Sequence, residues 1–128
     1  MKINQEIIIK STAKDVFAAL TTSEKFTELT GVPAIIDPTE GGKFTCFGGM
    51  ISGQTIEIEP SQLLVQAWRV GNWDKGIYSI IKLELEPIND STIKLLFEHS
   101  GFPEGQETHL ASGWHERYWE PLKKYLEK

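Results

Sequence analysis

One stretch, residues 40–73, constrains the fold more than any other part of the chain. It reads EGGKFTCFGGMISGQTIEIEPSQLLVQAWRVGNW, with large apolar or β-branched residues between glycines and other turn residues. Glycine accepts the positive φ angles of tight turns, and β-branched and aromatic residues favour strands. The stretch therefore predicts successive strands of a strongly bent antiparallel sheet, with a tight turn at Gly48-Gly49 and a bulge or bend at Gly53.

Length and composition limit the class of protein. The chain has 128 residues, which is enough for one compact domain and too few for two, so we expect a single domain over residues 1–128. No apolar run approaches the roughly 20 residues that span a bilayer, and the short apolar run near the N-terminus predicts a strand, not a signal peptide. The net charge of −5 and the absence of a Lys/Arg cluster argue against a nucleic-acid partner.

The single cysteine gives a prediction about the compartment. Cys46 has no second cysteine to pair with, so no disulfide can form inside the chain. This fits a reducing compartment, and we expect a cytoplasmic protein with no membrane partner.

The chain before residue 34 predicts a strand and two short helices. Residues 3–10 alternate between isoleucines and polar residues, which is typical of a half-buried strand. Thr12 and Asp15 resemble a capping box at the start of a helix over residues 11–20. Ser23 can cap a second helix over residues 24–29, and Gly31 ends it.

From residue 34 to residue 100 the sequence is almost wholly of strand type. The expected strands cover residues 35–36, 43–47, 50–59, 63–70 and 77–86, and a last strand puts Ile93, Leu95, Phe97 and His99 on one face. Ile56 and Ile58 alternate with polar neighbours. Residues 63–70 are nearly all apolar, which predicts a central strand or one covered on both faces.

The chain ends in one long amphipathic helix, predicted from Glu107 to Leu126. Its apolar residues recur at spacings of three and four, as a helix with one buried stripe requires. Two residues break the usual helix rules. We expect Gly113 to let the helix backbone approach a strand closely, and Pro121 to kink the helix.

The order of these elements defines an α+β class. Sequential hairpins favour a curved antiparallel sheet of about six or seven strands, with two short helices after the first strand. The apolar stripe of the last helix must be buried, and the concave face of the sheet is the available partner. A bent sheet that grips a long helix leaves a space between them, which is a natural site for an apolar ligand.

Several short motifs, in this order and spacing, resemble a known family. They are Glu40-Gly41-Gly42-Lys43-Phe44, Phe47-Gly48-Gly49, Ile51-Ser52-Gly53, Ile58-Glu59-Pro60, Gln66-Ala67-Trp68-Arg69, Gly76 to Tyr78, His99-Ser100-Gly101-Phe102-Pro103 and Gly113-Trp114. Together they resemble the AHSA-type domain of the SRPBCC, or START-like helix-grip, superfamily, and the resemblance covers nearly the whole chain. This domain forms the C-terminal part of the eukaryotic activator of the heat-shock-protein-90 ATPase and also occurs alone in bacteria. The eukaryotic activator has an additional N-terminal chaperone-docking domain, for which these 128 residues have no room, so the co-chaperone role does not transfer directly.

The polar candidates for chemistry are few. His99 is either a polar group in the cavity, available to orient a ligand or to act as acid or base, or a core histidine bonded to a neighbour. His109 and His115 are six residues apart, so they do not share a helix face, and with Cys46 they match no zinc signature. Cys46 itself is expected to be a small core residue. We therefore expect no catalytic constellation, no metal site and no cofactor.

The four tryptophans suggest an aromatic interior. Trp114 fits a pocket lining and a plain core position equally well. Trp119 leaves the main helix stripe, so we expect it to be partly exposed. Together with Trp73 in its loop, it is a candidate for a pocket mouth or for a surface that binds a partner.

These observations lead to one function hypothesis and two alternatives. The first is a cytoplasmic helix-grip domain that binds a small hydrophobic or amphipathic ligand between the long helix and the sheet, lined by Phe44, Phe97, His99, Trp114 and Tyr118. The first alternative is a chaperone-associated or stress-related protein that acts through its surface. The second is an enzyme of the cyclase or hydrolase kind, which would need polar groups such as Gln54, Tyr78, His99 and Tyr118 in the cavity.

Overall fold

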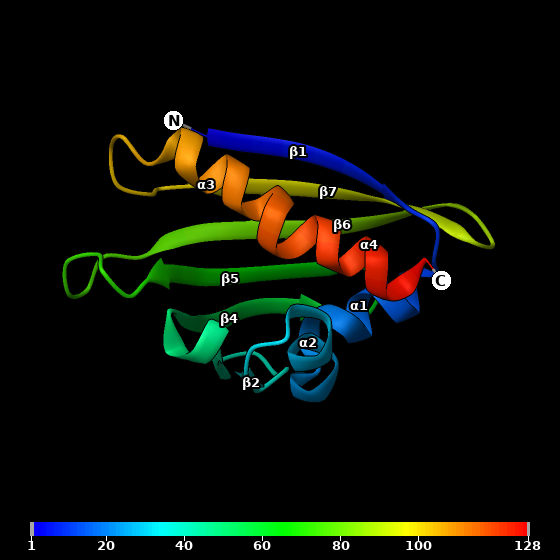
Figure 1. The fold of residues 1–128 in the computed structure, drawn as a ribbon, viewed down its shortest axis with the longest axis horizontal. Helices are drawn as coiled ribbons and strands as arrows, with labels where there is room; N and C mark the ends of the chain where they lie inside the picture. Colours follow the sequence, from blue (N-terminus) through cyan, green and yellow to red (C-terminus); the bar gives the residue numbers. More distant parts are fainter. Residues whose placement is uncertain (1, 128) are drawn as a thin grey trace.

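The computed structural model describes residues 2–127, which form one sheet and a set of helices on its concave face. The strands are β1 (Lys2–Ile9), β2 (Ile35–Ile36), β3 (Lys43–Cys46), β4 (Ile51–Glu59), β5 (Leu63–Val70), β6 (Ser79–Asn89) and β7 (Thr92–Ser100). They are antiparallel in the order β1-β7-β6-β5-β4-β3-β2. The long C-terminal helical segment lies diagonally across this sheet, which confirms the predicted helix-grip architecture (Figure 1).

The strands that carry the centre of the core follow the predicted alternation. In β7, and in β6 as far as Leu85, every second side chain is buried, so Ile81, Leu83, Phe97 and His99 all point toward the helix. β5 is central, as expected, but only one of its faces is fully covered. Leu64, Gln66 and Trp68 of β5 are buried, while the alternate residues on its outer face are half exposed.

Two short helices, α1 (Ala13–Thr21) and α2 (Ser23–Thr30), follow the first strand as predicted. The Thr12 hydroxyl accepts a hydrogen bond from the Asp15 backbone N–H at 3.1 Å, which confirms the N-cap. Gly31 ends α2 with a φ of 77°. The prediction for Ser23 was wrong, because its hydroxyl bonds to the backbone of Ile36 and so ties α2 to the short strand β2.

The glycine-rich turns differ from the prediction in two places. The predicted tight turn is present, and Gly48 and Gly49 both have positive φ, but it forms part of a 3₁₀ turn, η1 (Phe47–Gly49), in which Phe47 has a positive φ as well. Gly53 is not the bulge: it lies in a regular part of β4, where a Cβ atom would come 1.9 Å from the carbonyl oxygen of Ala67. Glycine is needed there because the neighbouring strand leaves no room for a side chain.

The irregularity in β4 falls instead at Ile56, three residues later. The register with β5 shifts between Thr55 and Glu57, so Ile56 is the extra residue. Its side chain is 49% exposed, whereas Thr55 is buried. The predicted alternation of Ile56 with Ile58 therefore fails because a bulge changes which residues face inward.

The long helix runs from Glu107 to Leu126 as predicted, but it contains one wide turn. It consists of α3 (Glu107–Trp114), a π-helical turn η2 (His115–Trp119) and α4 (Glu120–Leu126). In η2 the Glu120 N–H bonds to the carbonyl of His115, five residues earlier. One extra residue in a turn shifts the apolar stripe, so that residues five apart lie one above the other.

This wide turn corrects the prediction for Trp119. The Trp119 ring stacks on Trp114, five residues before it, with 5.5 Å between centroids and 19° between planes. Trp119 is therefore buried, not partly exposed, and its indole N–H donates to Gln5 Oε1 at 2.7 Å. Trp73 is also buried, against Trp68, so neither residue offers the exposed surface that the sequence suggested.

Gly113 and Pro121 have different explanations from each other. A Cβ atom on Gly113 would meet nothing within 4 Å, so the prediction of a close approach to a strand was wrong. Pro121 directly follows the wide turn and lies in the first turn of α4. A proline lacks the N–H that a regular helix requires at this position. The wide turn η2 therefore lies next to the residue that would interrupt a regular helix.

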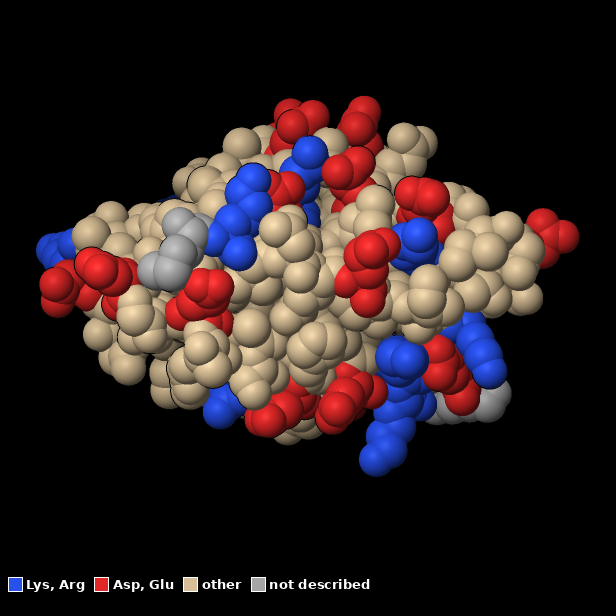
Figure 2. All heavy atoms as spheres, turned by 90° about the horizontal axis from the view of Figure 1, so that it is seen from above, with Lys and Arg blue, Asp and Glu red and all other residues tan. Residues whose placement is uncertain are grey.

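The charged side chains on the face shown in Figure 2 and the hydropathy of the helices indicate no basic surface and no membrane-spanning helix in the part of the chain that the structure describes. Acidic and basic side chains are interspersed on the face shown in Figure 2, and basic residues form no continuous area on it. Within residues 2–127, none of the helices has the length and the hydropathy of a membrane span.

The close contact at Gly53 gives a stability prediction. Gly53→Ala should lower the free energy of unfolding by about 1–3 kcal/mol or more, because the new methyl group meets backbone that cannot move without separating β4 from β5. Urea denaturation monitored by tryptophan fluorescence measures this change.

Gly113→Ala is the matched control, since it adds the same methyl group in open space. It should raise the free energy of unfolding by about 0.5–1 kcal/mol through helix propensity. Equal effects of the two substitutions would contradict the structural assignment of both glycines.

Candidate functional site: a filled interior beside an open groove

His99 stands at the centre of a chain of hydrogen bonds that ties the helix to the sheet. The Trp114 indole N–H donates to His99 Nδ1 at 3.0 Å, and His99 Nε2 lies 2.8 Å from the Ser79 hydroxyl. Ser79 in turn donates to the carbonyl of Trp68 at 2.8 Å. Because an indole only donates, Nδ1 of His99 must be the acceptor. Nε2 of His99 is therefore protonated and donates a hydrogen bond to the hydroxyl oxygen of Ser79.

This network leaves His99 neutral and fully used. The ring is completely buried, and burial lowers the pKa of His99 from its ordinary value of 6.5 to about 4. Both ring nitrogens already have partners, so His99 has no polar atom left for a ligand. Of the two interpretations of this residue, the geometry corresponds to the core histidine bonded to its neighbours.

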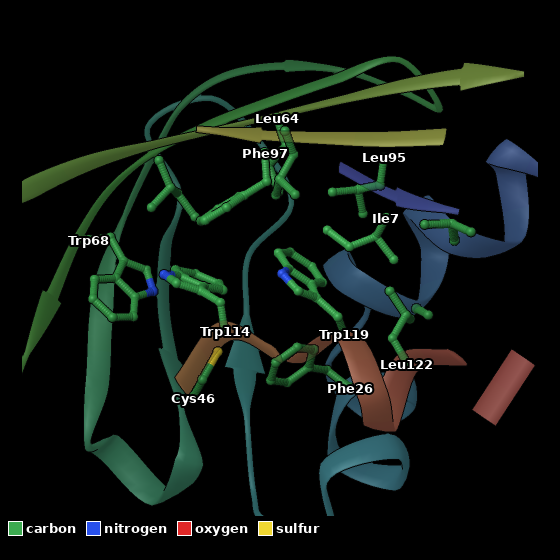
Figure 3. Packing of buried hydrophobic residues seen from close by; sticks show 14 of the residues in the cluster. Ile7, Phe26, Cys46, Leu64, Trp68, Leu95, Phe97, Trp114, Trp119 and Leu122 are labelled. Atoms are coloured by element: carbon green, nitrogen blue, oxygen red, sulfur yellow. The ribbon is translucent and has the colours of Figure 1, made fainter. Parts of the chain in front are cut away.

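Aromatic rings fill the space between helix and sheet. Trp114 contacts Phe97 with 4.3 Å between ring centroids, Tyr118 at 4.2 Å and Trp68 at 5.1 Å, and Trp119 contacts Phe97 at 5.1 Å. Figure 3 shows the rings of Trp68, Phe97, Trp114 and Trp119 between the sheet and the helix, together with Phe26 and Leu122. The residues predicted to line a cavity thus largely pack against one another.

A small cavity in this interior has a volume of about 30 Å³. It is lined by Leu20, Phe26, Ile36, Phe44, Cys46, Leu64, Gln66, Trp68, Ile81, Leu83, Trp114, Tyr118 and Trp119. Binding pockets for small molecules usually measure about 300–1,000 Å³, and a single water molecule occupies about 30 Å³ of liquid. A space of this volume is large enough for a water molecule and too small for a ligand of the usual size.

The two groups with acidic protons in this interior are inert at neutral pH. Burial raises the pKa of the Cys46 thiol to about 12. Burial, followed by the nearby Cys46, also raises the pKa of the Tyr118 phenol well above its usual value. A thiol that stays protonated is a poor nucleophile, so Cys46 is a core residue, as the sequence predicted.

A larger, open groove lies at one end of the helix and has a volume of about 210 Å³. Its lining comes from three separate segments of the chain. The residues are Phe47, Met50, Ile51, Trp68, Val70, Asn72, Gln106, His109, Leu110, Gly113, Trp114, Arg117 and Tyr118. We call this site the α3 groove. Gly113 faces it, which explains why a Cβ atom there would meet no neighbour.

The predicted ligand-binding residues divide between these places. Trp114 and Tyr118 line the α3 groove and also the small cavity, whereas Phe44 lines the cavity only. Phe97 and His99 lie beneath Trp114 and reach neither space. Sequence reasoning missed Phe47, Met50, Gly113 and Arg117 because the groove joins segments whose proximity no spacing reveals.

No group of three or more His, Cys, Asp or Glu side chains that could hold a metal ion occurs among the residues that the structure describes. His109 and His115 are both exposed, whereas Cys46 is buried. The arrangement offers an apolar surface with a polar rim, which suits binding better than bond making.

The fold and the position of the long helix define a helix-grip domain. The chain matches the family described as "Activator of Hsp90 ATPase homolog 1-like protein" over residues 10–127, and it belongs to this family. It is 29% identical over 122 residues to the human activator of 90 kDa heat shock protein ATPase homolog 1, and 27% identical over 120 residues to the mouse homolog 2. These alignments cover 95% and 94% of this chain but 36% of each relative, so the chain spans about a third of their length.

Solved structures support the fold assignment. An HSP90 activator from Plasmodium falciparum superposes with a TM-score of 0.92 at 24% identity, covering 97% of this chain and 94% of the other. The Aha1 dimer from Colwellia psychrerythraea gives a TM-score of 0.83 at 21% identity, covering 99% of this chain and 96% of the other. At these identities the likeness concerns the fold alone.

The buried histidine gives a prediction about pH. The unfolded chain binds a proton at His99 below about pH 6.5, while the folded chain does so only below about pH 4. Folding therefore becomes less favourable as the pH falls through this window, by about 3 kcal/mol in total at 1.36 kcal/mol per pH unit.

The measurement is urea denaturation at several pH values between 4 and 7 on the native protein and on His99→Gln. The variant should be less stable at pH 7, because Trp114 or Ser79 loses its partner. Its stability should also depend less on pH than that of the native protein. Parallel pH profiles of the two proteins would contradict the assignment.

Proposed function

We propose that this domain is a chaperone-associated binding module that acts through its surface on a chaperone of the Hsp90 type. The observation that carries the proposal is the filled interior, since about 30 Å³ leaves no room for the cargo of a carrier protein. The family and the named activity of its curated relatives support a chaperone of this type as the partner. A cytoplasmic site of action belongs to the same proposal, and the buried, unpaired Cys46 is consistent with it.

Binding to the chaperone is the direct test. The purified domain should bind the Hsp90-type chaperone of the same cell in isothermal titration calorimetry, and it should increase the ATPase rate of the chaperone to a saturating value. ATPase activity that survives an Hsp90 inhibitor is subtracted as contamination. Absence of binding at chaperone concentrations of tens of micromolar would reject the proposal.

A second candidate function is binding of a small hydrophobic or amphipathic molecule. One observation favours it: Trp114 and Tyr118, both predicted ligand contacts, form part of the open α3 groove of about 210 Å³. Apolar contact with these rings would supply affinity, and polar groups at the rim would set orientation. The groove lies below the usual range of ligand pockets, so the molecule would be small or partly exposed.

Native mass spectrometry distinguishes this second candidate. A protein that carries such a molecule should show a defined extra mass, which is lost in a denatured control. Gly113→Leu, whose side chain would extend into the groove, should abolish the extra mass without unfolding the protein, because no protein atom obstructs the new Cβ atom. Retention of the extra mass in this variant would exclude the groove as its site.

A further inference from the structure

The α3 groove has a charge character unlike that of the rest of the molecule. The chain carries a net charge of −5, yet Arg117 and His109 line the groove and no Asp or Glu of residues 2–127 does. None of the ion pairs within the described part of the chain involves Arg117. Arg117 and Tyr118 are neighbours in the chain, and both line the groove.

The floor and walls of the groove are built for an apolar group. Trp68, Trp114 and Tyr118 form an aromatic floor, and Phe47 and Met50 form one wall. Met50 is 52% exposed although it is a large apolar residue. Methionine adapts its shape to different partners and is common on binding surfaces.

The wall formed by η1 holds a strained residue. Phe47 has a φ of 54°, which a bulky side chain rarely adopts. Its ring is fixed by edge-on contacts with Phe26 at 5.9 Å and with Tyr118 at 5.4 Å. A strained conformation kept in place by its surroundings is a reason to look for function at that position.

We infer that the α3 groove binds an acidic segment of the partner protein that presents one large apolar side chain. The apolar side chain lies on Trp114 and Tyr118, and a neighbouring carboxylate pairs with Arg117. The size of the groove favours a single inserted side chain over a drug-sized molecule, and the unpaired cation favours a negative neighbour. This inference rests on the proposed function, because it names the part of the surface through which a chaperone partner is held.

The first experiment uses defined peptides. A fluorescein-labelled peptide Glu-Asp-Leu-Trp-Asp-Glu is compared with Gln-Asn-Leu-Trp-Asn-Gln and with Glu-Asp-Ser-Ser-Asp-Glu by fluorescence anisotropy. The acidic apolar peptide should bind best. Loss of its charges should weaken binding about tenfold, and loss of its apolar pair should abolish it. Equal affinity of the first two peptides, or no binding of the first at millimolar concentration, would overturn the inference.

The second experiment places the peptide on the protein. Arg117→Glu reverses an exposed charge at the groove, and Gly113→Leu fills the groove from the helix side. Lys124→Glu is the matched control, since Lys124 is an exposed cation on the same helical segment outside the groove. The first two variants should weaken peptide binding about tenfold, and the control should not. Circular dichroism melting verifies that all three remain folded.

Measuring how the three variants bind the chaperone then distinguishes failure of the inference from failure of the proposed function. If Arg117→Glu and Gly113→Leu weaken chaperone binding and Lys124→Glu does not, the inference holds. If all three variants bind the chaperone as the native protein does, the inference fails and the proposed function stands. Peptide binding at the groove without any chaperone binding would reject the proposed function alone. Octanoate is tested as a small amphipathic probe beside the peptides. If the groove binds octanoate and none of the three peptides, the inference is overturned in favour of a small-molecule site.

Discussion

The structure depends on the contact between the Trp114 indole and His99. This one hydrogen bond joins the middle of the long helix to the last strand, and Ser79 extends it to the backbone of β5. Burying a histidine would be costly if either nitrogen lacked a partner, but here each has one. Because the ring is neutral and both bonds have a fixed direction, the network also determines how the helix is turned about its axis.

The same contact decides what the interior can do. Once Trp114 is held over His99, its ring lies on Phe97 and the stacked ring of Trp119 covers the next layer. The wide helical turn at residues 115–119 is what allows both tryptophans to face the sheet. An architecture that can enclose a ligand is thus converted into one with a packed aromatic core.

The sequence predicted the fold well because strand alternation is a local property. Parity placed Phe97 and His99 on the inner face of β7, and the structure agrees. Parity failed at Ile56, where a bulge inserts one residue, and helix periodicity failed at Trp119, where the π-helical turn does the same. Both errors have one cause: an inserted residue shifts every later side chain, and no local pattern announces the insertion. The α3 groove was not predictable either, since it joins residues near 50, 70 and 113 that meet only in the folded chain.

Because the core is filled, a binding site is more easily formed at the surface. Gly113 distinguishes one part of that surface, the α3 groove. A glycine in an exposed helix costs stability relative to alanine, and here no close packing requires it. Its absent side chain leaves space in the groove beside the half-buried Tyr118 and the edge of the buried Trp114. Arg117, which has no ion-pair partner in the described structure, lies on the same groove. Aromatic rings, a strained residue at Phe47 and the positive charge of Arg117 thus occur together at this groove. A partner that supplies an apolar side chain and a negative charge would complement this groove, which is the physical reason for the binding proposed above.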